Sequence, residues 1–159
     1  MEPTLKTLSA MTLVGVSGAF IPEKTNMTVI PQLWDMLRKR GGEIKNIISG
    51  PSVGLINCLP LLSETDEKME LVYMAAVPVA SLDNLPAGMW ATTVPAAQYA
   101  VFCSSVKNDQ INKVIDYAYG DWLPKSGYTR AAGPELEFYA ADFHPVKKPE
   151  FDYAVPIRK

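Results

Sequence analysis

The amino-acid sequence predicts an α+β fold in which two helices cover one face of a curved antiparallel sheet. Strand-like and helix-like segments follow one another in the order strand, helix, strand, strand, and this order then occurs a second time. Short stretches of the first half match stretches of the second half in the same order. The 159 residues are 48% hydrophobic, which is sufficient for the core of one globular domain.

The first half is expected to contain one helix and three strands. The helix places four apolar residues on one face, and two glycines end it. These apolar residues are Ile30, Leu33, Trp34 and Leu37. The expected elements are a strand at 11–17, the helix at 26–42, and strands at 52–58 and 69–79, with a polar link at 63–68.

The second half repeats this order after a turn-forming segment at 82–88, "LDNLPAG". Its helix has apolar residues at the same four offsets, which are Ile111, Val114, Ile115 and Ala118. The expected elements are a strand at 96–105, the helix at 108–123, and strands at 135–140 and 151–157.

Two pairs of matching stretches suggest that the chain is a duplicated βαββ unit. "SGPSVGLI" at 49–56 resembles "AGPELEFY" at 132–139, and "ELVYMAAVPV" at 70–79 resembles "EFDYAVPI" at 150–157. The second pair differs by two residues, an even number that preserves the alternation of a strand. We therefore expect a single domain over 1–159, with one repeat at about 1–84, a second at about 85–159, and a ligand cleft between them.

The stretch "GPELEFY" at 133–139 places acids in a predicted strand, where glutamate is uncommon. Alternation puts Glu135, Glu137 and Tyr139 on one face and Leu136 and Phe138 on the other. We expect the apolar pair to pack against the helices and the Glu-Tyr face to line the concave side. Aligning the two repeats sets Gly54 opposite Glu137, which would leave room for a ligand.

Composition argues against several classes of function. The formal net charge is −2 and the basic residues do not form a face, so direct nucleic-acid binding is not expected. The sequence has neither an apolar run long enough to span a membrane nor the pattern of a signal peptide, so we expect a cytoplasmic location.

Metal and cofactor sites are not expected either. Cys58 and Cys103 lie in apolar strand-like runs and are expected to be buried free thiols. His144, the single histidine, has no partner pattern for catalysis or metal binding. No cofactor is therefore expected.

Three ordered motifs resemble those of the GyrI-like effector-binding domain, which occurs in AraC- and MerR-type regulators and in stand-alone and integron cassette proteins. They are "VPAAQYAVF" at 94–102, "GPELEFY" at 133–139 and "YAVPIRK" at 153–159, and "IPQLWDML" at 30–37 is similar to the stand-alone branch. The resemblance covers the whole chain. It implies a tandem βαββ fold whose cleft binds lipophilic, often cationic, aromatic molecules.

The resemblance also implies a site. The glutamate of the family's "E-x-Y" strand, which contacts the cation, corresponds to Glu137. Glu135 has no such counterpart and is expected at a rim. The candidate ligand-binding residues are Glu137, Trp90, Tyr73, Tyr139, Phe20 and Gly54, whereas Trp34 and Trp122 are expected to be structural.

Three functions remain open at this point. The first is a sensor or sequestering protein for lipophilic cations, which lacks room for a DNA-binding domain. The second is a hydrolase of strained electrophilic compounds, with Glu137 as general base. The third is a protein-interaction module that resembles a gyrase inhibitor, with a partner that the sequence does not identify.

Overall fold

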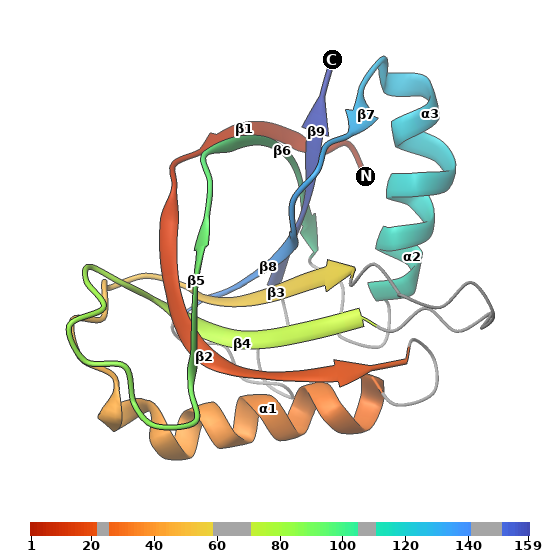
Figure 1. Ribbon diagram of the computed structural model, residues 1–159. Coiled ribbons are helices and arrows are strands. Elements are labelled where there is room, and N and C mark those ends of the chain that lie inside the picture. The colour runs from red at the N-terminus through yellow and green to blue at the C-terminus, as the bar shows by residue number, and fades with distance from the viewer. Residues whose placement is uncertain (22–25, 59–70, 105–110, 141–150) are drawn as a thin grey trace, which may run out of the picture.

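Figure 1 shows the computed structural model of the chain, which describes residues 1–21, 26–58, 71–104, 111–140 and 151–159. The polar link expected at 63–68 and His144 lie outside the described residues, as does the side chain of Cys58. None of the helices in the described ranges is long and apolar enough to cross a membrane.

The expected α+β fold is confirmed, and every expected strand and helix is present in the described ranges. The first half contains β1 (Thr4–Leu8), β2 (Met11–Phe20), α1 (Asn26–Arg40), β3 (Ser52–Cys58) and β4 (Leu71–Val79). The second half contains β5 (Trp90–Val94), β6 (Ala97–Ser104), α2 (Ile111–Asp116), α3 (Leu123–Ser126), β7 (Thr129–Arg130), β8 (Glu135–Tyr139) and β9 (Phe151–Arg158). The sequence did not predict β1, β5 or the short β7.

The expected second helix is divided by a π-helical segment, Tyr117–Trp122, which joins α2 to α3. This segment contains Gly120, and its wider turn carries three aromatic residues. The helix ends at Gly127, whose positive φ of 74° is a conformation that glycine adopts without strain.

The strands of the described residues form one antiparallel sheet in the order β1-β6-β9-β8-β3-β4-β2-β5, with β7 added beside β9. The order is symmetric about the β8–β3 pair, because each half contributes its corresponding three strands on its own side. The two outer strands are exchanged, so that β1 pairs with β6 and β5 pairs with β2. Both rise from the sheet on the side away from α1, which gives the sheet its curvature (Figure 1).

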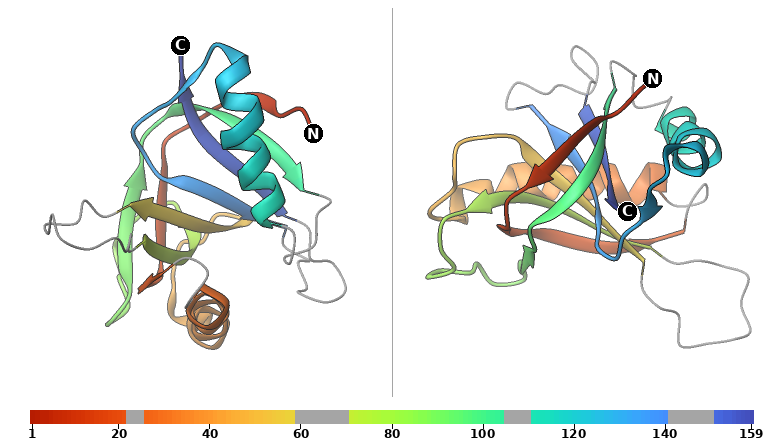
Figure 2. Two further views of the ribbon diagram at one scale, coloured as in Figure 1. Left: turned by 90° about the vertical axis from the view of Figure 1, so that its right-hand side faces the viewer. Right: turned by 90° about the horizontal axis from the view of Figure 1, so that it is seen from above.

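The sheet separates two apolar layers. One face packs on itself inside the curve, with a cluster that includes Leu13, Val53, Leu55, Met74, Val101 and Leu136. The other face carries both helices: Leu33 and Leu37 of α1 pack on one half, and Val114 and Ala118 pack on the other. Figure 2 shows α1 end-on below the sheet, with the α2–α3 segment running in a different direction.

Two predictions about burial are wrong. Leu136 and Phe138 do not pack against the helices, because they belong to the cluster on the opposite face. Alternation in β8 therefore directs the Glu-Tyr face toward the helices and not into the curve of the sheet. Cys103 is exposed and not buried, because it lies at the end of β6, beyond the core.

Candidate functional site

Glu137 lies in the central strand pair of the sheet, on the face that carries the two helices. Across β3 it is in register with Gly54, as the repeat alignment predicted, and across β9 it is in register with Tyr153. Its side chain is 6% exposed, and it is the one buried charged residue in the described part of the chain. A charge in this position is costly unless it is compensated.

Two phenols donate hydrogen bonds to the same oxygen of Glu137. The hydroxyl groups of Tyr73 on β4 and Tyr139 on β8 lie 2.6 Å and 2.7 Å from Oε2. Among the described residues, no group donates to Oε1 and no cation forms an ion pair with this carboxylate. We call Glu137, Tyr73, Tyr139, Gly54 and Trp34 the Glu137 cluster.

Trp34 of α1 completes this cluster from the helix side. Its indole Nε1 donates to the Tyr73 hydroxyl at 3.0 Å, and its ring meets that of Tyr139 edge-on, with centroids 4.8 Å apart. Trp34 was expected to be structural. Helical periodicity placed it on the buried face of α1, but only the packing of α1 on the sheet shows that it contacts these tyrosines.

Gly54 makes this arrangement possible. A Cβ atom at this position would lie 2.2 Å from the Tyr73 hydroxyl oxygen and 2.8 Å from Glu137 Oε2. The space that was expected to admit a ligand is therefore filled by the Tyr73 hydroxyl. The glycine allows the phenol to approach the carboxylate directly above the sheet.

Burial controls the protonation of this cluster. Desolvation raises the pKa of Glu137, the hydrogen bonds from Tyr73 and Tyr139 oppose this shift, and the charge of Glu135 adds to it. Desolvation also raises the pKa of both tyrosines well above the usual range. The phenols therefore keep their protons and act as donors to the carboxylate.

Glu135, two residues earlier on the same face, has different surroundings. Tyr119 of the π-helical segment donates to its Oε1, and Tyr153 donates to its Oε2. Arg130 Nε lies 3.3 Å from Oε1, so the negative charge is compensated. Glu135 is part-buried, and the fold brings three polar side chains to it from other elements, which the sequence did not indicate.

The remaining predicted site residues divide into two groups. Phe20 is buried, and its ring lies edge-on to the Tyr73 ring, with centroids 6.4 Å apart. It therefore packs against one member of the Glu137 cluster. Trp90 is on β5, four strands from β8, and is 64% exposed. The structure therefore separates Trp90 from the cluster, because the unpredicted strand β5 carries it to the edge of the sheet.

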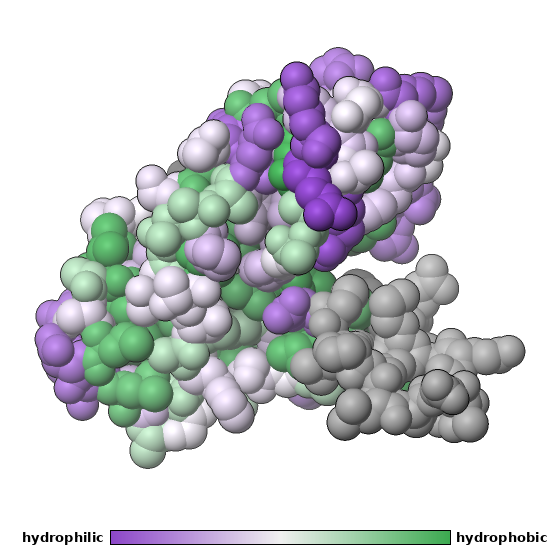
Figure 3. Space-filling model, turned by 45° about the horizontal axis from the view of Figure 1, so that its top comes forward, coloured by the Kyte–Doolittle hydropathy of each residue, from purple (hydrophilic) through white to green (hydrophobic). Residues whose placement is uncertain are grey.

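Trp90 is one of several large exposed apolar residues. Others are Ile47, Ile48, Leu82 and Leu85. Figure 3 shows apolar residues gathered at the end of the molecule opposite the α2–α3 segment.

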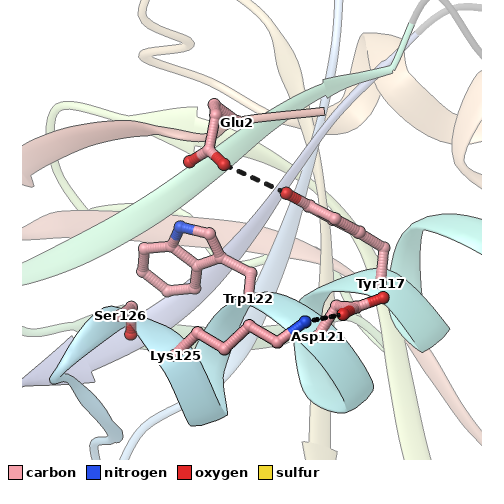
Figure 4. Close-up of a pocket in the computed structure, with 6 residues that line it drawn as sticks. All are labelled: Glu2, Tyr117, Asp121, Trp122, Lys125 and Ser126. Carbon is pink, nitrogen blue, oxygen red and sulfur yellow. Dashed lines mark hydrogen bonds and ion pairs between the residues drawn. The ribbon is translucent and has the colours of Figure 1, made fainter.

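A surface cavity of about 380 Å³ lies elsewhere, between the N-terminal segment and the π-helical and α3 residues (Figure 4). It is lined by Glu2, Tyr117, Asp121, Trp122, Lys125 and Ser126. Its polar groups largely satisfy one another, since the Tyr117 hydroxyl donates to Glu2 at 3.2 Å and Lys125 pairs with Asp121. No member of the Glu137 cluster lines it.

The sequence model of the GyrI-like small molecule binding domain matches residues 1–158. The chain belongs to this family. Among the relatives of this GyrI-like protein, a DNA gyrase inhibitor of Erwinia billingiae is 25% identical over 116 residues, which are 72% of this chain and 74% of that protein.

Solved structures share the fold of this GyrI-like chain. The structure of SAV2435 bound to tetraphenylphosphonium has a TM-score of 0.72 and 20% identity, covering 99% of this chain and 94% of that one. An integron cassette protein of Vibrio cholerae has a TM-score of 0.67 and 13% identity, covering 99% and 96% of the two chains.

Proposed function

We propose that this GyrI-like protein binds lipophilic, cationic aromatic small molecules at the Glu137 cluster. One observation carries the proposal: Glu137 is a buried carboxylate that has two phenol donors on one oxygen and no cation among the described residues. A positively charged ligand supplies the missing compensation.

The physical chemistry favours a cation over a neutral ligand. A unit charge about 4 Å from a carboxylate is attracted by about 4 kcal/mol at an effective dielectric constant of about 20, against about 1 kcal/mol in water. Buried aromatic rings around the carboxylate add cation–π attraction of about 0.5–2 kcal/mol each. Neither interaction demands a particular ligand shape, so cations of different outline can bind.

Trp34 is the residue through which a ligand reaches the carboxylate. It is the half-buried aromatic member of the cluster, whereas Tyr73 and Tyr139 are almost completely buried. Its indole donates one hydrogen bond, to Tyr73, and its ring packs edge-on against the rings of Tyr73 and Tyr139. Rotation of Trp34 away from Tyr139 opens the helix side of the cluster and leaves the indole as an aromatic wall.

The family and one relative support this proposal. The family is described as binding small molecules, and SAV2435, which has the same fold, was solved with a lipophilic aromatic cation. Tetraphenylphosphonium is therefore a reasonable first ligand to test on this chain.

The test is isothermal titration calorimetry with tetraphenylphosphonium on the wild type and on Glu137→Gln. Glutamine keeps the size and an acceptor oxygen but removes the charge, so we expect about 100-fold weaker binding, which corresponds to about 2.7 kcal/mol. The neutral analogue triphenylphosphine oxide should bind both proteins weakly and equally.

Glu43→Gln is the matched control. Glu43 is an exposed glutamate that pairs with Arg40, so this variant has the same change in net charge without touching the cluster. It should bind tetraphenylphosphonium as the wild type does. Equal affinity of Glu137→Gln and the wild type would contradict the proposal.

A further inference from the structure

We propose that Arg130 determines the charge of the ligand that this site accepts: by neutralising Glu135, it makes the site selective for a single positive charge over two. This inference rests on the proposed function, since it concerns ligands bound at Glu137. It assigns a specificity-determining role to a residue that lies outside the Glu137 cluster.

The two carboxylates are placed so that one ligand can interact with both. Glu135 and Glu137 are two residues apart on the same face of β8, which separates their Cα atoms by about 7 Å along the strand. Tyr153 links them, because its backbone is in register with Glu137 while its hydroxyl donates to Glu135. The environment of Glu135 therefore borders directly on the proposed cation site.

Arg130 is held firmly against Glu135. Its Nε donates to the Tyr119 hydroxyl at 3.2 Å and to Glu135 Oε1 at 3.3 Å. Its two terminal nitrogens donate to the carbonyl oxygens of Ala131 and Gly133 at 3.1 Å and 3.2 Å. Because the guanidinium group is fixed by the turn between β7 and β8, it cannot easily leave Glu135 for another partner.

The charges then add up to a single negative charge. The charges of Glu135 and Arg130 sum to zero and that of Glu137 remains, so the three side chains together present a net charge of −1 to a ligand. The side chains of Arg130 and Glu135 are 33% and 15% exposed, so solvent screens the pair only in part. Without Arg130, two uncompensated carboxylates would face the ligand and would favour two cationic groups spaced by a short rigid linker.

The experiment compares two matched ligands on the full chain. Benzyltrimethylammonium carries one charge, and para-xylylene-bis(trimethylammonium) carries a second on the opposite side of the same ring. Affinities are measured by calorimetry or by NMR titration for the wild type, Arg130→Met and Arg130→Lys. Circular dichroism and thermal unfolding establish that each variant is folded.

We expect Arg130→Met to raise the affinity for the dication relative to the monocation by about tenfold. Arg130→Lys keeps the positive charge and should leave this ratio within about twofold of the wild type. The double variant Arg130→Met with Glu135→Gln has neither charge and should return the ratio to that of the wild type. An unchanged ratio in folded Arg130→Met would overturn the inference.

Glu135→Gln keeps the inference testable if Arg130→Met does not fold. This variant leaves Arg130 without its carboxylate partner, so it should weaken binding of the dication by a larger factor than binding of the monocation. Equal weakening of both ligands would overturn the inference. If neither these ligands nor tetraphenylphosphonium binds the wild type, the proposed function fails and the inference fails with it.

Discussion

Glu135 and Glu137 are the same residue type on the same face of one short strand, yet the fold treats them differently. Glu135 accepts hydrogen bonds on both oxygens and pairs with Arg130. Glu137 is more deeply buried, accepts its described hydrogen bonds on one oxygen, and has no described cationic partner. The first arrangement satisfies a carboxylate, and the second leaves one that a ligand can satisfy.

The two glutamates differ in whether the protein compensates their charge, and this difference bears on which of them is a candidate ligand contact. A buried charge that the protein itself compensates contributes to structure, whereas a buried charge that it leaves uncompensated reduces stability. Residues that reduce stability in this way are concentrated at functional sites. This contrast supports the proposal that Glu137, and not Glu135, is the carboxylate that contacts the cation directly.

The largest change in stability is expected from Gly54→Ala, which disturbs the surroundings of Glu137 and leaves those of Glu135 unchanged. The new methyl group would overlap the Tyr73 hydroxyl and Glu137 Oε2, and Tyr73 is completely buried. We expect a loss of about 3 kcal/mol in the free energy of unfolding, measured by urea denaturation.

Gly120→Ala is the control for this substitution. A Cβ atom at Gly120 meets nothing within 4 Å. Because alanine favours helical backbone over glycine, this variant should be as stable as the wild type or up to about 1 kcal/mol more stable. Similar stability of both variants would show that the approach of Tyr73 to Glu137 is not tightly constrained.

A smaller effect, of opposite sign at the two sites, is expected when each glutamate is replaced by glutamine. Glu137→Gln removes an uncompensated buried charge and should raise the free energy of unfolding at pH 8 by about 1–2 kcal/mol. Glu135→Gln leaves Arg130 without its charged partner and should lower it by about 1–2 kcal/mol. Urea denaturation of both variants at several pH values measures the two differences.

The stability difference between Glu137→Gln and the wild type should depend on pH. Burial raises the pKa of Glu137 in the folded state above its unfolded value. Between these two values the folded protein binds more protons than the unfolded chain, so rising pH destabilises the wild type. The advantage of Glu137→Gln should therefore be largest above the folded pKa and should disappear as the pH falls to the unfolded pKa. Destabilisation by Glu137→Gln at pH 8 would refute our reading of this carboxylate.

The smallest effect is expected from removing a single phenol donor. If the ionised carboxylate binds the cation as proposed, affinity for tetraphenylphosphonium should fall as the pH drops through the pKa of Glu137. Tyr73→Phe removes one hydrogen bond that lowers this pKa, so the fall should begin at higher pH. The net contribution of one hydrogen bond, about 1 kcal/mol, limits how far the pH midpoint of this fall in affinity can move.

Tyr119→Phe is the matched variant at the other glutamate. It removes a phenol donor from Glu135 and leaves both donors of Glu137 in place. Calorimetric titrations with tetraphenylphosphonium over a pH series should show the affinity of this variant falling with the same pH midpoint as the wild type. If the midpoint moved as far as it does in Tyr73→Phe, the hydrogen bonds of Glu135 would influence the protonation of Glu137 as strongly as its own do.

Much of the fold could be predicted from the sequence because its determinants are local or repeated. Alternation correctly placed Glu135, Glu137 and Tyr139 on one face, since successive side chains of a strand must point to opposite sides. The alignment of the two similar stretches correctly set Gly54 against Glu137, which are in register between β3 and β8. The family resemblance indicated Glu137 as the ligand contact, and this stays a prediction.

The rest depended on contacts between residues that are distant in the sequence. Alternation defines two faces but does not say which one the helices cover, so Leu136 and Phe138 were assigned to the wrong layer. Trp34 and Tyr73 are 39 residues apart and meet only when α1 packs on β4. The exchange of β1 and β5 between the halves, which carries Trp90 to an edge, has no local signal.

The sequence by itself determined the positions of the six longer strands it predicted and of the helical segments, and the acids that β8 carries, because periodicity is a property of the chain. Only the tertiary structure decided which glutamate is compensated. Arg130 reaches Glu135 through the turn before β8, and Tyr119 and Tyr153 reach it from two other elements. Whether a buried charge is satisfied depends on all the groups that fold around it, and that information is absent from any single strand.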